Sequence, residues 1–169
     1  EIDRAVEAVA ERINRDYAAC DTPIFLGVLN GSFMFFSDLI KKVDFNNEIS
    51  FVKLASYAGT NSTGEVQQLI GLNSPIEGRH IIIVEDIIDS GFTLSYLTRM
   101  LPARGAASIK ICTLLDKPAR RAPGITLKAD YSGFEIPDAF VVGYGLDYAE
   151  MYRNLPYIGI LKPEVYEKN

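Results

Sequence analysis

Short apolar runs alternate along the chain with longer segments whose apolar residues recur at helical spacing. Five runs rich in Ile, Val, Leu and Phe predict strands: residues 24–29, 49–55, 80–85, 108–115 and 139–144. Three segments predict helices: residues 2–13, 33–43 and 93–101. Because most of the strand-like runs are apolar throughout, the sheet that they form should be covered on both faces. The pattern therefore predicts a three-layer α/β domain with a central, mainly parallel sheet.

The alternation changes at two places. Pro102 is expected to stop or kink the helix that contains it before Gly105. Across residues 48–72, two strand-like runs flank a polar, glycine-containing segment, which predicts an antiparallel hairpin at one edge of the sheet. Because no internal repeat, low-complexity tract or linker is evident, residues 1–169 are expected to form a single domain.

Composition and charge narrow the class of protein. Hydrophobic residues make up 48% of the chain, which is typical of a folded globular protein. The formal net charge of -5 gives no general attraction to nucleic acid or anionic lipid, and the longest nearly apolar stretch, residues 23–36, is too short to cross a bilayer. Cys20 and Cys112 have no CxxC motif or His nearby and are expected to be reduced thiols, as in a cytoplasmic protein.

The stretch VEDIIDSGFT, residues 84–93, places three carboxylates and a glycine turn at the end of an apolar strand. The carboxylates are Glu85, Asp86 and Asp89. Ligands of open α/β sheets bind beyond the carboxyl ends of the strands, where the small residues within 90–93 can wrap a phosphate at a helix N-terminus. The acids would repel that phosphate unless they contact hydroxyls, a metal ion or a protonated group, which favours a sugar phosphate bound with Mg²⁺. The structural alternative is a helix capped by Asp89 or Ser90, with the other acids in solvent.

This stretch resembles the phosphoribosyl-pyrophosphate binding motif of the purine phosphoribosyltransferases, in their hypoxanthine (guanine) branch. The resemblance implies the type I fold of that family, with a hairpin lid and a small hood. It also implies that Glu85 and Asp86 hold the ribose hydroxyls and the associated Mg²⁺, and that Asp89 is catalytic near purine N7. The loop that would cradle the 5′-phosphate runs from Asp89 through Ser90, Gly91, Phe92 and Thr93. Phe92 stands where many relatives have Lys or another residue, so the phosphate would depend on backbone amides and hydroxyls.

Residues 28–39, VLNGSFMFFSDL, contain an Asn-Gly pair that on its own also fits a hairpin turn. The helix-like spacing after the pair favours instead a connection from a strand to a helix at the ligand-facing edge. By resemblance to the family, Leu29, Asn30 and Gly31 would bind pyrophosphate, in a loop that often contains a cis peptide bond. Many relatives have Lys at the position of Asn30, so backbone amides and Mg²⁺ would have to replace its charge.

The segment SYAGTNSTGEV, residues 56–66, fits an exposed hairpin loop by its composition alone. It also resembles the mobile lid of the family, in which a Ser-Tyr pair closes over pyrophosphate. In this chain the pair is Ser56 and Tyr57. Closure of such a lid would keep water away from the activated sugar.

The stretch LLDKPARR, residues 114–121, fits a solvated basic turn. Lys117 directly follows an apolar strand, however, and resembles the family lysine that donates to the 6-oxo group of the purine. Because an ammonium group only donates, it would meet the 6-amino group of adenine donor to donor, so adenine should be rejected. Arg120 and Arg121 are expected to be surface charges.

Residues 136–161 are so rich in apolar side chains that core packing is the default interpretation of each aromatic. The segment nevertheless resembles the carboxy-terminal signature of the family. By that resemblance, Phe140 would stack on the base and Val141 would bond its edge through backbone groups. Asp147 would hold a second Mg²⁺, and Arg153 would contact pyrophosphate, to which a forked guanidinium is suited.

Together these matches imply a purine salvage enzyme that converts hypoxanthine, and by analogy guanine, with 5-phosphoribosyl 1-pyrophosphate to IMP or GMP and pyrophosphate. Two other classes stay open: a non-catalytic regulator of the same fold that senses the sugar pyrophosphate, and a phosphate-binding α/β module with different chemistry. A regulator would normally carry a basic face or an added DNA-binding segment. The resemblance also implies a homodimer or homotetramer, to which exposed aromatics such as Phe35 or Phe36 would contribute.

Overall fold

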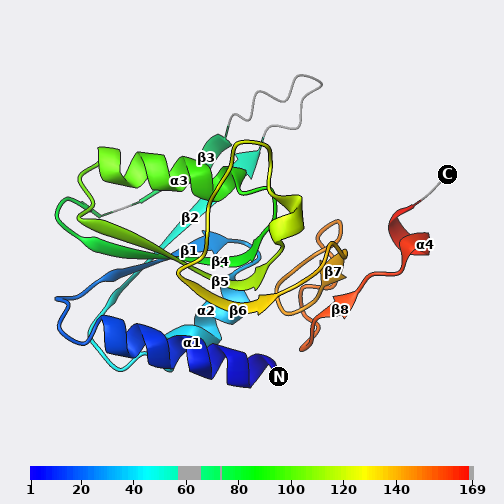
Figure 1. Cartoon of the computed structure of the whole chain (residues 1–169), viewed down its shortest axis with the longest axis horizontal. Coiled ribbons are helices and arrows are strands. Elements are labelled where there is room, and N and C mark those ends of the chain that lie inside the picture. Colours follow the sequence, from blue (N-terminus) through cyan, green and yellow to red (C-terminus); the bar gives the residue numbers. More distant parts are fainter. Residues whose placement is uncertain (57–65, 73, 168–169) are drawn as a thin grey trace.

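The computed structural model describes residues 1–56, 66–72 and 74–167, and its centre is a six-stranded sheet in the order β3-β2-β1-β4-β5-β6 (Figure 1). The strands are β1 (Ile24–Leu29), β2 (Glu48–Ser56), β3 (Val66–Ile70), β4 (His80–Ile88), β5 (Ser108–Asp116) and β6 (Tyr131–Glu135). Strands β2, β1, β4, β5 and β6 are parallel, and β3 pairs antiparallel with β2 at one edge. The mainly parallel sheet and the edge hairpin predicted from the sequence are confirmed.

Helices cover both faces of this sheet: α1 (Ile2–Asp16) and α2 (Phe33–Ile40) lie on one face, and α3 (Phe92–Ala103) lies on the other (Figure 1). Each face has its own core, because successive residues of a strand point to opposite sides. Ile82 belongs to the core under α1 and α2, whereas its neighbour Ile83 belongs to the core under α3. Burial on both sides explains why β4 is apolar along its first half, and it confirms the three-layer prediction.

The parallel strands β1 and β4 lie side by side, and the chain adds its next strand on opposite sides of this pair. From β1 the chain passes through α2 to β2 on one side, and from β4 it passes through α3 to β5 on the other. Because β1 and β4 are paired as far as Gly27 and Val84, the loops that leave their carboxyl ends start side by side and then diverge. Such a switch point opens a crevice in which open α/β sheets bind ligands.

A second, smaller sheet lies beyond the carboxyl ends of the main strands and forms a hood over them (Figure 1). Its strands are β7 (Val141–Val142) and β8 (Gly159–Ile160), and the short helix α4 (Pro163–Tyr166) follows. The strand predicted over residues 139–144 is therefore mostly irregular. It ends early because Gly143 and Gly145 have φ angles of +98° and +100°. At Gly143 a Cβ atom would lie 2.0 Å from the carbonyl oxygen of Tyr157, so only glycine fits there.

The structure corrects the prediction that Phe35 and Phe36 are exposed. They are 0% and 4% exposed and lie in the core between α2 and the sheet, together with Leu39. Phe33 is the exposed aromatic of this helix, at 43%. The aromatic run of α2 covers more than one face of the helix, and its spacing does not say which residues of the run face inward.

The end of α3 and the strand β6 can also be compared with what the sequence predicts. Helix α3 contains Pro102 in its last turn and ends at Ala103, before Gly105 at a φ of +92°, so the predicted stop is confirmed. The sequence did not predict β6, because YSGFE mixes polar, glycine and aromatic residues.

None of the helices within the described ranges is long and apolar enough to span a bilayer. Cys20 and Cys112 are free thiols, and Cys112 is buried.

Candidate active site

Two adjacent carboxylates lie at the end of β4, beside the switch point. Glu85 is only 7% exposed, and Asp86 is half-buried. The amide of Asp86 donates to Glu85 Oε1 at 3.3 Å, and the amide of Ile87 donates to Asp86 Oδ1 at 2.9 Å. Burial raises the pKa of Glu85 well above its usual range, and the charge of Asp86 adds to the effect. Burial also raises the pKa of Asp86. Raised carboxyl pKa values in a crevice are typical of a functional site.

The donor set at these carboxylates fits a hard divalent cation. Neither Glu85 nor Asp86 forms an ion pair with another described residue, although the charge of Arg153 acts on Asp86 from farther away. Within the described ranges, no three His, Cys, Asp or Glu side chains gather closely enough to hold a metal ion by themselves. Mg²⁺ commonly binds one or two carboxylates and completes its shell with water and substrate oxygens. The residues present therefore fit Mg²⁺ that arrives with an oxygen-rich ligand.

The loop between β1 and α2 packs directly on Asp86. A Cβ atom at Gly31 would lie 1.9 Å from Asp86 Oδ2, so only glycine allows this approach. The peptide bond between Leu29 and Asn30 is cis. Since α2 begins at Phe33, the predicted connection from a strand to a helix is confirmed, and the hairpin-turn alternative for the Asn-Gly pair is wrong.

The loop of residues 89–93 leads from β4 into α3 and has the features of an anion site. Gly91 is the N-cap of α3 at a φ of +88°, and no side chain caps the helix, so the capping alternative for Asp89 or Ser90 is wrong. Four successive backbone amides of this loop donate no hydrogen bond in any loop, turn or cap contact of the described residues. They are the amides of Ser90, Gly91, Phe92 and Thr93. The first amides of a helix have no partner within it, and free amides there bind phosphate.

Two adjoining cavities open at this edge of the sheet. The first, of about 280 Å³, lies between the β1–α2 loop, the paired carboxylates, residues 89–93 and Arg153. The second, of about 610 Å³, lies between Lys117 and the hood. Four residues line both cavities and form their shared wall: Asp86, Ile87, Asp89 and Asp147. A ligand with two dissimilar ends can therefore reach from one cavity into the other.

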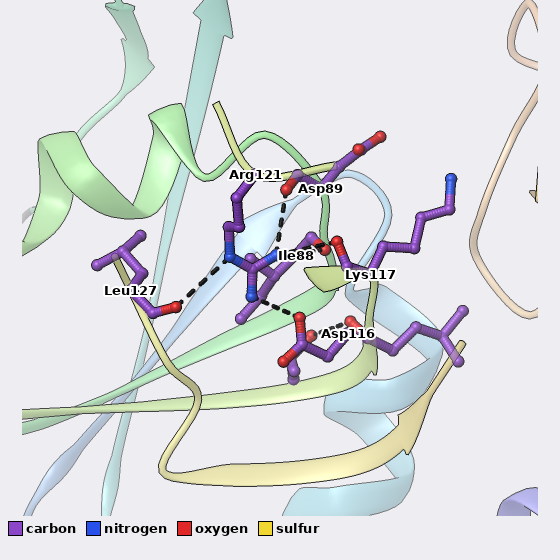
Figure 2. Close-up of polar contacts among 8 residues, drawn as sticks. Ile88, Asp89, Asp116, Lys117, Arg121 and Leu127 are labelled. Atoms are coloured by element: carbon purple, nitrogen blue, oxygen red, sulfur yellow. Dashed lines mark hydrogen bonds and ion pairs between the residues drawn. The ribbon is translucent and has the colours of Figure 1, made fainter. Parts of the chain in front are cut away.

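Lys117 lies at the end of β5, just before the 3₁₀ helix η1 (Pro118–Arg120). The residue is only 7% exposed and lines the second cavity. Figure 2 shows its side chain extending away from the polar contacts around Arg121, and its amine has no hydrogen bond or ion pair with any residue that the structure describes. An amine that lines a cavity and has no partner among the described residues favours an acceptor on a ligand over a solvated basic turn.

The hood supplies the aromatic side of the second cavity. Phe140 and Val141 both line it, and Val141 is the first residue of β7. The ring of Tyr166 in α4 stacks on the Phe140 ring, with centroids 4.9 Å apart and planes 21° apart. This contact could not be predicted from residue patterns, because α4 is a single short turn. One face of the Phe140 ring is thus covered by the protein itself.

Asp147 of the shared wall is paired with Arg153, which lines the first cavity only. Arg153 donates to the carbonyl oxygen of Gly145 at 2.8 Å, and its Nη2 lies 3.5 Å from Asp147 Oδ2 and 3.3 Å from Glu150 Oε2. The Nε atom of Arg153 is buried and has no hydrogen-bond partner among the described residues. Arg153 lines the first cavity, so its guanidinium group lies beside any anionic ligand that binds there.

Asp89 and the two arginines after Lys117 differ in their surroundings. Asp89 Oδ1 lies 3.5 Å from Nε of Arg120, which also lies 3.7 Å from Asp138 Oδ1. Arg120 is exposed, as predicted, but the prediction of a surface charge at Arg121 is wrong. The Arg121 side chain is 13% exposed, because the chain turns back after η1 and carries it against the 89–93 loop.

The predicted lid starts beside the first cavity. Ser56 is the last residue of β2, and Leu54 of the same strand lines that cavity. Tyr57 and the rest of the lid up to residue 65 lie outside the described residues.

Comparisons with known proteins agree with this geometry. The model of the phosphoribosyl transferase domain family matches residues 1–149. The hypoxanthine-guanine phosphoribosyltransferase of Bacillus subtilis (strain 168) is 54% identical over 169 residues, which cover 99% of this chain and 92% of that protein. The protein of that name in Lactococcus lactis subsp. lactis is 50% identical, with 99% and 90% covered. A crystal structure of a hypoxanthine phosphoribosyltransferase from Staphylococcus aureus superposes with a TM-score of 0.93 at 48% identity, covering 99% of this chain and 90% of that one. The chain belongs to the phosphoribosyl transferase domain family.

Proposed function

We propose that this chain transfers the 5-phosphoribosyl group from 5-phosphoribosyl 1-pyrophosphate to hypoxanthine, giving IMP and pyrophosphate, and that it also uses guanine to give GMP. One observation carries this proposal. The unpartnered amine of Lys117 and the free amides of residues 90–93 lie in two cavities with a common acidic wall. The similarity to proteins named hypoxanthine-guanine phosphoribosyltransferase supports it. Nothing in the described residues favours a regulator.

The first cavity is proposed to bind the sugar. The 5′-phosphate accepts hydrogen bonds from the amides of residues 90–93 and from the hydroxyls of Ser90 and Thr93. Glu85 and Asp86 accept hydrogen bonds from the ribose hydroxyls. Pyrophosphate lies against the loop of Leu29, Asn30 and Gly31 and is bonded by Arg153, with the pair Ser56 and Tyr57 closing over it.

Mg²⁺ is the proposed cofactor, with one ion held by Glu85 and Asp86 and a second held by Asp147. When bound with the sugar pyrophosphate, it neutralises the leaving group and lowers the barrier to its departure. The chain's own part is to keep these carboxylates close to the cavity and to exclude water from it.

The second cavity is proposed to bind the base. Lys117 donates to the 6-oxo group, Phe140 stacks on the ring, and backbone groups of Val141 bond its edge. Purine N9 then attacks C1 of the ribose as the bond from C1 to pyrophosphate breaks. Asp89, which lines both cavities, accepts the purine proton near N7. Because the ammonium group of Lys117 can only donate, adenine is a poor substrate.

We further propose a single catalytic domain of residues 1–169 that acts in the cytoplasm as a homodimer or homotetramer. Its partners are the small-molecule substrates, with neither nucleic acid nor membrane among them. The net charge of -5 gives no general attraction to nucleic acid, which supports the choice of small-molecule partners. The assembly state is tested by light scattering of the purified chain.

The proposed activity is tested by measuring kcat/KM for hypoxanthine, guanine, xanthine and adenine with 5-phosphoribosyl 1-pyrophosphate and Mg²⁺, by absorbance. Formation of IMP and GMP with little use of adenine is expected, and a chelator should abolish it. Absence of turnover with every purine, or use of adenine as good as that of hypoxanthine, would contradict the proposal. Identification of the product by mass confirms which nucleotide forms.

A further inference from the structure

Arg121 makes an unusually large number of contacts behind the 89–93 loop (Figure 2). Its guanidinium group reaches four backbone carbonyls and one carboxylate. Nη1 donates to the carbonyl oxygens of Ile88 at 3.1 Å, Asp89 at 3.1 Å and Lys117 at 3.3 Å; Nε donates to Leu127 at 3.5 Å; and Nη2 donates to Asp116 Oδ1 at 2.5 Å. These partners belong to three separate segments of the chain, around residues 88–89, 116–117 and 127.

The contacts of Arg121 set the direction of the loop's carbonyl groups. Arg121 takes the carbonyls of Ile88 and Asp89, and the amide of its neighbour Ala122 donates to the carbonyl of Ser90 at 3.0 Å. The next carbonyl, of Gly91, accepts from the amide of Ser95 at 2.8 Å. Four successive carbonyls are thus engaged by the protein, while the amides of residues 90–93 stay free. An anion site needs this polarity, because a carbonyl oxygen facing a phosphate would repel it.

The same side chain also connects backbone segments that line the two cavities. Its bond to the carbonyl of Lys117 fixes the residue whose amine lines the second cavity, and its bonds to Ile88 and Asp89 fix the start of the loop that lines the first. The packing is close, since a Cβ atom at Gly91 would lie 2.9 Å from Ile125 and 3.6 Å from Cδ of Arg121. Arg121 therefore connects the backbone of Lys117 to the 89–93 loop.

Arg121 itself has no role in direct ligand binding. It lines neither cavity, and Asp116, whose side chain is as buried as its own, balances its charge. Its three nitrogen atoms are all engaged with carbonyl or carboxylate oxygens. An effect of Arg121 on a ligand must therefore pass through the backbone that it holds.

We propose that Arg121 is a positioning residue that keeps the 89–93 loop in its phosphate-binding shape and couples that loop to Lys117. The inference rests on the proposed function, and it assigns to Arg121 the affinity for the 5′-phosphate end of the substrate and of the nucleotide product. A lysine at this position would carry the charge but could not reach several carbonyls with one planar group. Replacement by Lys should therefore behave much like replacement by Gln.

The test compares Arg121→Gln and Arg121→Lys with a matched control, Arg79→Gln. Arg79 also joins an ion pair, to Glu48 at 3.2 Å, with a bond to a carbonyl, that of Thr22 at 2.7 Å, but it lies before β4, at the opposite edge of the sheet. Both Arg121 variants should raise the KM for 5-phosphoribosyl 1-pyrophosphate and the Kd for IMP by about tenfold or more, since each loses charged hydrogen bonds to the loop. Arg79→Gln should lower the Tm without changing either constant.

A second measurement separates positioning from general destabilisation. In Arg121→Ala, guanidinium ion added well below the unfolding transition should restore part of the IMP affinity, whereas the same concentration of sodium chloride should not. Unchanged KM and Kd in the Arg121 variants, or equal loss in Arg79→Gln, would overturn the inference. If the parent chain binds IMP and forms it, that result rejects only the role of Arg121; if the parent does neither, the proposed function itself fails.

Discussion

At the scale of single residues, the proposed chemistry depends on the different surroundings of three charged side chains. Asp89 is half exposed and pairs with an exposed arginine, Lys117 is buried without a partner, and Glu85 is buried beside another carboxylate. Asp89 is therefore accessible to a ligand, Lys117 can offer hydrogen bonds to one, and Glu85 carries its charge at a cost to stability. Each difference leads to a prediction of its own.

Replacement of Asp89 by Asn keeps its shape and removes its basicity. Asp89→Asn should lower kcat by at least about tenfold, because a general base typically contributes that much or more, while the KM for the sugar pyrophosphate changes little. Asp138→Asn, which removes the other carboxylate near Arg120, is the matched control and should lower kcat far less. Steady-state kinetics in both variants decide the point, and an unchanged kcat in Asp89→Asn would remove Asp89 from this role.

Lys117→Gln should change the choice of base more than the binding of sugar. We expect a higher KM for hypoxanthine and a smaller ratio of kcat/KM between hypoxanthine and adenine, because an amide can both donate and accept. Lys128→Gln, at an exposed position outside both cavities, serves as the control. If Lys117→Gln used hypoxanthine as well as the parent does, the lysine would not be the base-recognition group.

The raised pKa of Glu85 predicts how stability without ligand depends on pH. Because burial raises the pKa of Glu85 in the folded chain above its value in the unfolded chain, the folded state gains stability from the proton at low pH. That stability is fully present below the ordinary Glu pKa of about 4.3 and is lost as the pH rises through the folded pKa. Glu85→Gln removes this dependence, so the variant should melt at a higher temperature than the parent at pH 8, with a smaller gap at acidic pH.

Thermal melts of ligand-free protein across this pH range test the prediction. Glu77→Gln, at an exposed glutamate, should leave the profile of the parent unchanged. The Glu85 variant should also bind the sugar pyrophosphate with Mg²⁺ more weakly. Equal melting temperatures of parent and Glu85→Gln at every pH would show that burial of this carboxylate costs no stability.

At the scale of elements, the site depends on close contact between loops that leave different strands. The β1–α2 loop lies between Asp86 of β4 and the hood, since a Cβ atom at Gly145 would lie 2.3 Å from the carbonyl oxygen of Gly31. The hydrogen bond from the amide of Gly145 to the carbonyl of Arg153 extends this contact to the arginine of the first cavity. A shift of the β1–α2 loop would therefore also move Asp86 or the hood.

Gly31→Ala tests this packing. The added methyl group would lie 1.9 Å from Asp86 Oδ2, so the loop or the carboxylate must move. We expect the KM for the sugar pyrophosphate to rise by about tenfold or more, by analogy with the cost of misplacing substrate-positioning groups. Gly159→Ala is the control, because its Cβ would meet only the ring of Tyr157 at 3.8 Å, and its kinetics should match the parent. Wild-type kinetics in Gly31→Ala would mean that the loop position is unimportant.

Sequence patterns predicted elements best where burial is uniform. The apolar residues of β4 are buried on both faces, so their continuous run marked the strand, and the acids after it marked the ligand-binding edge. Strand β6 and the inward direction of Phe35 and Phe36 were missed because they depend on packing against α1, which is distant in sequence. Short-range patterns do not contain that information.

At the scale of the whole molecule, the topology brings together groups that are far apart in the chain. The switch point between β1 and β4 places the loops of residues 29–31 and 89–93 next to each other, and the hood adds Phe140 and Arg153 from the last third of the chain. The resemblance to a known family named these residues from the sequence. The contacts of Arg121 could not be predicted from the sequence, because most of its partners are backbone carbonyls. Every residue has such a carbonyl, so the residue types do not show which ones an arginine binds.

The central claim is that one nucleotide spans both cavities, with its phosphate at the free amides of residues 90–93 and its base at the amine of Lys117. A crystal structure of the chain with bound IMP tests this claim most directly. We predict that the 5′-phosphate lies against residues 90–93, with Ser90 and Thr93 in hydrogen-bond contact, and that the 6-oxo group accepts a hydrogen bond from Nζ of Lys117. A phosphate bound at any other place, or a base turned away from Lys117, would contradict the account.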